Sequence, residues 1–103
     1  MNREQIVQWF AEDAENEKVE WDFFDKLPAE KKLHPSERIS GILKLTSLMK
    51  KPDAFDFGAE HDEVNFYVGP RDLVDTVTED DLMYLEGCGI HYSRENDAFY
   101  MFC

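Results

Sequence analysis

The fold is decided by residues 78–102, which read TEDDLMYLEGCGIHYSRENDAFYMF. Thr78 is a good helix N-cap, and Asp81 three residues later is a shorter relative of the capping-box glutamate. This pattern predicts a short helix over residues 79–86, followed by a hairpin. The second strand of that hairpin, residues 98–102, is apolar almost throughout. Because an apolar strand at a sheet edge invites aggregation, we expect this one to lie inside the sheet.

Two longer helices are expected upstream of this stretch. Residues 2–17 place apolar side chains at i, i+4 and i+8, with Asn2 as the N-cap. Pro35 fits the start of a second helix that runs to about Lys50. Residues 19–27 either extend the first helix or form a bent connection. The apolar face expected for the second helix consists of Ile39, Ile42, Leu43 and Thr46, joined by Leu45, Leu48 and Met49.

The segment between the helices has a period of two, which predicts a first hairpin over residues 55–68. We expect Gly58 in or near its bend, and Gly87 at the C′ position just after the last helix. Gly41 costs its helix about 1 kcal/mol relative to alanine unless close packing needs it. The chain of 103 residues is expected to form one domain, residues 1–103. The fold class is α+β, with N-terminal helices packed on a small antiparallel sheet of two hairpins separated by a short helix.

The charge of the chain is distributed unevenly. The formal net charge is −12. Residues 1–25 hold eight acidic and two basic side chains, whereas residues 26–51 hold two acidic and seven basic ones. Residues 52–103 hold thirteen acidic side chains against two basic ones. Such a surface repels nucleic acid and anionic membranes and attracts basic partners. We therefore expect no direct binding of nucleic acid or membrane.

The negative charge also exceeds what solubility requires, since a net charge of magnitude about 2–8 suffices for a small domain. Carboxylates at i and i+4 of a helix, such as Asp13 and Glu17, are spaced by about 6 Å along its axis. That step roughly matches alternate phosphates of one DNA strand. Together with the acidic residues at positions 72–86, they suggest a nucleic-acid mimic, and the alternative is a surface that serves only solubility.

Three large aromatic residues, Trp21, Phe23 and Phe24, lie within four positions of one another and are flanked by acids. A regular helix or strand cannot direct all three into one core. Either at least one is exposed as an anchor for a protein interface, or the chain bends and buries all three.

Other residue patterns give little support for catalysis or metal binding. Cys88 and His91 form a single C-x-x-H spacing, and structural zinc needs four ligands in paired spacings. The surrounding acids would raise the pKa of a Cys88 thiol and so disfavour a reactive thiolate. Close carboxylates, Glu60, Asp62 and Glu63 or Asp72 and Asp75, fit an acid–base pair or a hard-cation site, but also a solvated loop. We expect no enzyme activity, no metal and no cofactor.

The sequence also predicts where the protein resides. Two cysteines, Cys88 and Cys103, fit a reducing cytoplasm better than a disulfide framework. Residues 1–10 lack the pattern of a signal peptide, and no stretch approaches a membrane span. We expect an intact, cytoplasmic, soluble protein that is a monomer or a homodimer.

The chain resembles small acidic proteins of unknown function that phages and mobile elements carry. The resemblance lies in residues 78–82, residues 88–92 and residues 99–102, about a quarter of the chain. It implies an anti-defence role, of the anti-CRISPR or anti-restriction type, because such genomes encode small inhibitors of host nucleases and CRISPR complexes. No functional residue is carried over from it.

These observations predict a non-enzymatic inhibitor or decoy of a basic, nucleic-acid-handling protein. An immunity-type protein that neutralises a basic toxin is the first alternative. A small structural or adaptor protein is the second, and a hydrolase or metal-dependent enzyme built on His61, Cys88 and His91 is the third. The predicted partner-binding residues are Asp72, Asp75, Glu79, Asp80, Asp81, Glu86, Trp21 and Phe23.

Overall fold

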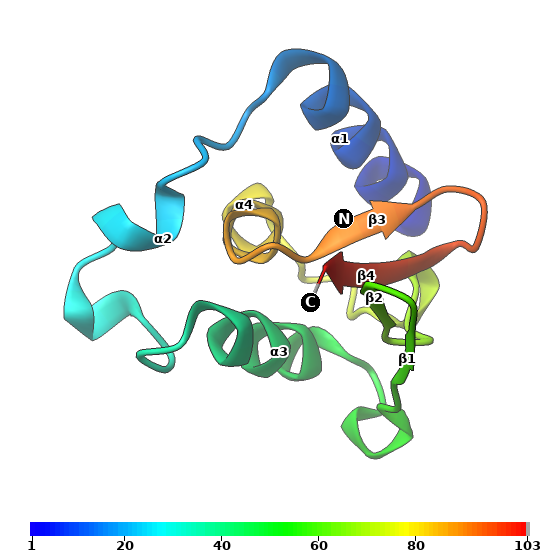
Figure 1. The fold of residues 1–103 in the computed structure, drawn as a ribbon. Coiled ribbons are helices and arrows are strands. Elements are labelled where there is room, and N and C mark those ends of the chain that lie inside the picture. Colours follow the sequence, from blue (N-terminus) through cyan, green and yellow to red (C-terminus); the bar gives the residue numbers. More distant parts are fainter. Residues whose placement is uncertain (103) are drawn as a thin grey trace.

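The computed structural model describes residues 1–102, which form helices packed on a four-stranded antiparallel sheet (Figure 1). Cys103, expected to be a free thiol, lies outside the described residues. The strands are β1 (Gly58–Glu60), β2 (Glu63–Asn65), β3 (His91–Ser93) and β4 (Ala98–Phe102), in the order β1-β2-β4-β3. The predicted α+β class, with two hairpins separated by a short helix, is confirmed.

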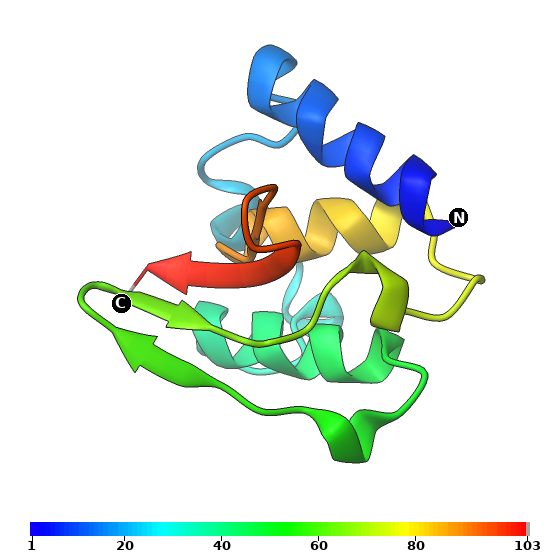
Figure 2. The ribbon, with the colours of Figure 1, turned by 90° about the vertical axis from the view of Figure 1, so that its right-hand side faces the viewer.

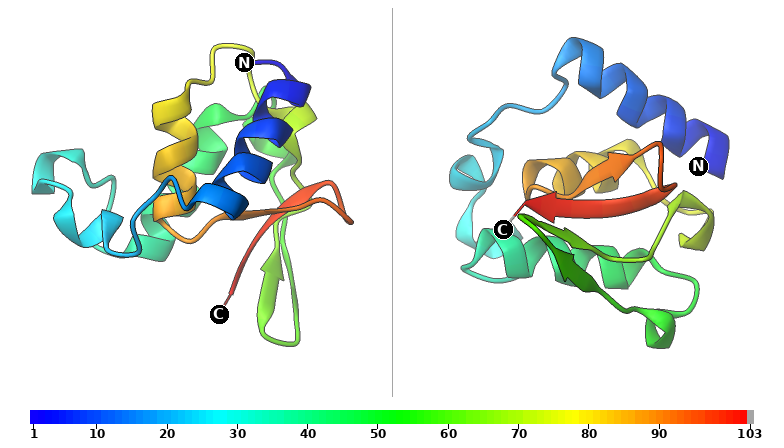
Figure 3. Two further views of the ribbon diagram at one scale, coloured as in Figure 1. Left: turned by 90° about the horizontal axis from the view of Figure 1, so that it is seen from above. Right: turned by 45° about the vertical axis from the view of Figure 1, so that its right-hand side comes forward.

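Three principal helices cover the sheet, and α4 (Glu79–Gly87) lies between α1 (Arg3–Asn16) and α3 (Glu37–Leu48) (Figures 1 and 2). The short helix α2 (Phe23–Lys26) and the turn after it stand out from the body (Figure 3). Short 3-10 turns complete the described elements: Ala29–Lys31, Pro52–Ala54 and Pro70–Asp72. Every helix among residues 1–102 is too short or too polar to cross a membrane.

Strand β4 lies inside the sheet, as its apolar sequence predicts. It pairs with β2 on one side and with β3 on the other. Phe99 is 0% exposed and Met101 is buried, whereas Phe102 is 55% exposed. The two faces of β4 therefore differ, and the face with Phe99 and Met101 belongs to the hydrophobic core beneath the helices.

The ends of the helices follow local capping chemistry. Asn2 and Gln5 form a capping box at the start of α1, and Thr78 and Asp81 form the predicted one at α4. The start of α3 differs from the prediction, because Ser36 is the N-cap and accepts a hydrogen bond from the Ile39 amide. Pro35 lies just before that cap. A side-chain acceptor for the free amides decides where the helix begins.

The buried face of α3 also differs from the predicted one. Ile39 and Leu43 are each 43% exposed, whereas Leu45, Leu48 and Gly41 are buried. A Cβ atom on Gly41 would lie 3.0 Å from Cys88 Cβ and from Ile90 Cγ1. The absence of a side chain at Gly41 therefore allows α3 to pack closely against the end of α4. This close packing is the reason for a glycine within the helix.

Two of the other glycines do not have their predicted roles. Gly87 is the last residue of α4, and Gly89, with φ +85°, takes the left-handed position after the helix. Gly87 is needed for another reason, because a Cβ there would collide with the ring of Phe23. Gly58 starts β1 instead of making the bend, and it leaves room for the Tyr67 hydroxyl. Residues 61–62 form the turn.

Candidate functional site: an acidic surface and cleft beside α4

Three of the six acidic residues predicted to bind a partner are exposed and unengaged. Asp75, Glu79 and Asp80 lie just before α4 or in its first turn. Within residues 1–102, their carboxylates make no ion pair and no side-chain hydrogen bond. A hollow of about 450 Å³ brings Glu4 and Glu12 of α1 beside Glu79. We call Glu4, Asp75, Glu79 and Asp80 the acidic surface.

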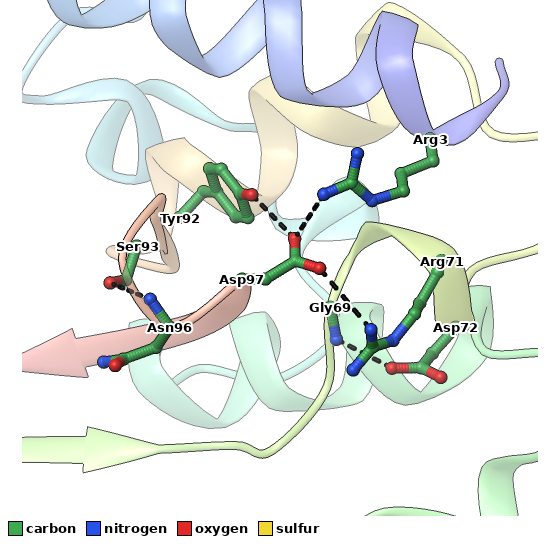
Figure 4. Close-up of polar contacts among 8 residues, drawn as sticks. All are labelled: Arg3, Gly69, Arg71, Asp72, Tyr92, Ser93, Asn96 and Asp97. Carbon is green, nitrogen blue, oxygen red and sulfur yellow. Dashed lines mark hydrogen bonds and ion pairs between the residues drawn. The ribbon is translucent and has the colours of Figure 1, made fainter.

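The other three acidic residues are engaged inside the protein. Asp81 accepts a hydrogen bond from the Thr78 amide at 2.9 Å and pairs with Lys44 Nζ at 2.7 Å. Partial burial raises the pKa of Asp81, but these hydrogen bonds and the charge of Lys44 outweigh it and hold the pKa below its usual value. Asp72 accepts a hydrogen bond from the Gly69 amide at 2.8 Å (Figure 4). Both carboxylates therefore serve the fold.

Glu86, the third engaged acid, holds His91 on the neighbouring strand. Its Oε1 lies 2.8 Å from His91 Nδ1. This hydrogen bond raises the pKa of His91, against the opposing effect of burial. The negative charges of Glu86 and Asp13 raise it further. Glu86 thus contributes to the electrostatics of both β3 and the end of α1.

We expect a Glu86→Gln substitution to lower the pKa of His91, which an NMR titration of the imidazole measures directly. Because folding raises this pKa, the pair stabilises the fold fully below the unfolded value of about 6.5 and loses its effect as pH rises through the folded value. In urea unfolding at acidic pH, the variant should therefore have a lower free energy of unfolding than wild type. This difference should disappear at alkaline pH. An equal loss at both pH values would contradict this account.

A cleft of about 660 Å³ opens where α1 and α4 end. It is lined by residues from the end of α1, from the connection to α2 and from the last turn of α4. Five of the lining side chains are acidic, namely Asp13, Glu17, Glu20, Asp22 and Glu86. The lining also contains Trp21 and one basic residue, Lys26. We call this the acidic cleft.

The aromatic cluster beside this cleft is divided by the bend of the chain. Trp21 is 90% exposed, Phe24 is buried, and Phe23 is partly buried. The Phe23 ring meets Tyr84 edge-on at a centroid distance of 6.3 Å and lies against Gly87. Of the two predicted aromatic anchors, Trp21 is therefore accessible to a partner, whereas Phe23 joins α2 to α4.

The proposed phosphate-like spacing of Asp13 and Glu17 is not a helical one. Helix α1 ends at Asn16, and Glu17 has a left-handed backbone with φ 48°. Asp13 is partly buried, and its Oδ1 is shielded from solvent without a hydrogen-bond partner among the described residues. Burial first, and then the charge of Glu86, raise the pKa of Asp13. These two carboxylates line a cleft rather than a regular track.

Asp97 is a structural residue that no sequence pattern singled out. Its carboxylate accepts a hydrogen bond from the Tyr92 hydroxyl at 2.7 Å and lies 3.1 Å from Arg3 and 3.7 Å from Arg71 (Figure 4). The Tyr92 hydrogen bond, followed by that of Arg3, lowers the pKa of Asp97 despite slight burial. Asp97 thereby ties the β3–β4 turn to α1, and Arg3 and Arg71 lie beside it.

The cysteine and the two histidines considered for catalysis or metal binding lie on different elements. Cys88 is 1% exposed, and burial, reinforced by the charge of Glu37, raises the pKa of its thiol to about 12. His61 lies in the β1–β2 turn, while His91 lies on β3 at the other side of the sheet. Within residues 1–102, no three His, Cys, Asp or Glu side chains are placed to hold a metal ion. Glu60 and Glu63 face each other across the β1–β2 hairpin.

We expect the thiol of Cys88 to be unreactive in the folded protein. A rise of its pKa from 9.0 to about 12 lowers the thiolate fraction at neutral pH by about 1000-fold. In a Cys103→Ser background, alkylation by iodoacetamide should be at least that much slower in buffer than in urea. Similar rates in the two solvents would contradict the buried placement and revive the cysteine nucleophile.

Comparison with known proteins finds no matching family model, no matching curated protein and no matching solved structure.

Proposed function

We propose that this protein is a non-enzymatic inhibitor that binds a basic, nucleic-acid-handling protein. The observation that carries this proposal is the acidic surface, whose carboxylates have no partner among residues 1–102. Unpaired carboxylates such as these, at the start of α4 and on α1, attract a cationic surface and accelerate association with it. The partner would lose the cationic surface that it uses to hold nucleic acid. The resemblance to small acidic phage proteins suggests an anti-defence setting for such an inhibitor.

The separation of charge supports this proposal. The basic segment, residues 26–51, contains α3 and flanks α4 on the side away from α1 (Figures 1 and 2). Lys44 of that segment is already paired with Asp81. The acidic surface is formed by α1 and the start of α4, and the Met1 ammonium, which donates a hydrogen bond to the Asp75 carbonyl, lies beside it. Complementary charge favours docking of a basic partner on this surface.

The decoy in this proposal works through the sign of its charge more than through a copied phosphate spacing. A regular series of helical carboxylates would favour strict mimicry, and the left-handed Glu17 interrupts the series that the sequence suggested. Competition for a cationic groove requires only complementary charge and a steric block.

An immunity-type protein that neutralises a basic toxin is the second candidate, and the exposure of Trp21 favours it. Tight interfaces concentrate their energy in a few aromatic or arginine anchors surrounded by a polar rim. Trp21 beside five carboxylates has this composition. The two candidates differ in the number of partners, because an immunity protein has one cognate toxin, typically encoded next to it.

The proposal is tested by capture and competition. The tagged protein is exposed to lysate of the source cells at low and at high salt, and the proteins retained are identified by mass spectrometry. We expect a basic nucleic-acid-binding protein that high salt releases. The purified partner should then lose bound DNA as the acidic protein is added. A partner that holds DNA and the acidic protein simultaneously, or one retained equally at both salt concentrations, would contradict the proposal.

A further inference from the structure

Two helices direct their C-terminal ends at the acidic cleft. Helices α1 and α4 run in the same direction, from the side of the N-terminus towards the connection at residues 17–22 (Figure 2). The carboxyl end of a helix carries a partial negative charge, which basic residues in the last turn commonly offset. Neither α1 nor α4 has a basic residue in its last turn. The cleft therefore combines two negative helix ends with carboxylates of the same sign.

Part of the charge of this cleft is balanced, because Lys26 pairs with two of its carboxylates and His91 engages Glu86. Lys26 Nζ lies 2.7 Å from Glu20 and 3.4 Å from Asp22. Glu17 at the end of α1 makes no ion pair within residues 1–102. Asp13 has a buried oxygen without a hydrogen-bond donor among the described residues, and the neighbouring Glu86 raises its pKa further. The unpaired carboxylate of Glu17 and the negative ends of the two helices favour one more cation here.

Trp21 offers a face for that cation. Three aromatic rings elsewhere in the helical part have a lysine ammonium over them, at centroid distances of 4.7 to 5.5 Å. These pairs are Lys18 with Trp9, Lys32 with Phe24, and Lys44 with Tyr84. Trp21 lines the cleft, is 90% exposed, and has no such cation among residues 1–102. Tryptophan is the side chain that binds cations best through its ring.

We propose that the acidic cleft receives an arginine side chain of the basic partner, stacked on Trp21 and paired with Glu17. This inference rests on the proposed function and specifies where one residue of the partner binds. Arginine is favoured over lysine because its planar guanidinium stacks on an indole while it donates paired hydrogen bonds to a carboxylate in its plane. Lysine presents a compact, strongly hydrated charge that meets these requirements less well.

The cleft can be tested without the partner by titrating the intact protein with Nα-acetyl-arginine amide. The readouts are the NMR signals of the Trp21 indole N–H and of the backbone amides of residues 17–22, with the indole assigned through a Trp21→Phe variant. We expect saturable shifts that the citrulline analogue, which lacks the charge, does not cause. The lysine analogue should bind more weakly than the arginine one. The indole signal of the buried Trp9 serves as an internal reference.

Variants of the cleft residues provide the second part of this test. Trp21→Ala should weaken arginine binding about fivefold, the size of an exposed cation–π contact. Glu17→Gln should weaken it by a similar factor, through the loss of one ion pair. The matched controls are Phe57→Ala and Glu60→Gln, which change an exposed aromatic and an exposed carboxylate outside the cleft, and they should leave the affinity unchanged.

Three results would overturn the inference. These are equal binding of the citrulline and arginine analogues, equal binding of the lysine and arginine analogues, or an unchanged arginine affinity in the two cleft variants. Its failure can be separated from failure of the proposed function. A partner that binds Trp21→Ala as tightly as wild type but requires the acidic surface removes the arginine site and keeps the inhibitor. Arginine binding in the cleft with no competition for DNA keeps the site and removes the inhibitor.

Discussion

Replacing Asp75, Glu79 and Asp80 together by lysine is expected to weaken binding of the basic partner by about 100-fold or more. Each exposed carboxylate contributes only a modest attraction, but reversal replaces attraction by repulsion at three neighbouring positions. Most of the loss should appear in the association rate, because charges at the rim of an interface act mainly by steering the encounter. Surface plasmon resonance of wild type and variant measures both rates.

The control for this reversal must separate charge at the interface from damage to α4. Glu79 and Asp80 also favour the first turn of α4 through the helix dipole, so lysine at these positions costs stability. The variant Asp75→Asn, Glu79→Gln, Asp80→Asn removes the charge with less penalty to the helix, and we expect it to lose part of the affinity. Reversal of Glu60, Asp62 and Glu63 gives the same change of net charge at another site. Equal losses from the two reversals would contradict a specific acidic surface.

Phe99→Ala is expected to destabilise the fold by about 3–5 kcal/mol, the usual cost of removing a fully buried phenylalanine. Phe99 lies on the central strand β4, with ring centroids 5.6 Å from Phe10 and 5.9 Å from Tyr92. The ring thus joins α1, β3 and β4 in one contact. A domain of this size has about 5–15 kcal/mol of stability, so this variant should lose a large fraction of it in urea unfolding.

Phe102→Ala is the matched control, because it makes the same change on the same strand, at a side chain that is 55% exposed. We expect a cost of less than about 1 kcal/mol there. Similar destabilisation by the two substitutions would contradict the orientation of β4, in which Phe99 faces the helices and Phe102 faces away from the core.

Local signals predicted the parts of the fold that local chemistry determines. The N-cap at Asn2 and the capping box at Thr78 depend on side chains within three residues, so the sequence contains all the information needed to place them. The interior position of β4 followed from its apolar composition. The roles of Gly87 and of the α3 face could not be predicted from the sequence. They depend on contacts with Phe23 and with Cys88, which the fold brings from other elements.

The candidate site divides in the same way. Its acidic character could be read from composition, whereas the sequence left open whether one aromatic residue is exposed or all three are buried. The composition does not reveal which carboxylates remain available to a partner. Asp81 is engaged by Lys44, and Glu86 by His91, through tertiary contacts. The acidic cleft depends on the parallel course of α1 and α4, which no spacing within either helix reveals. The one local sign of it was the acidic end of α1, which lacks a neutralising base.

The most direct test of the central claim is the dependence of partner binding on ionic strength. The affinity and the association rate for the purified partner are measured from about 50 to about 300 mM salt, a range over which the Debye length falls to a few ångströms. An inhibitor held by its acidic surface should associate much more slowly as salt increases, and the Asn/Gln variant of Asp75, Glu79 and Asp80 should lose most of that dependence. Binding that is equally fast and tight across the range, in both proteins, would show that the charge does not recognise the partner.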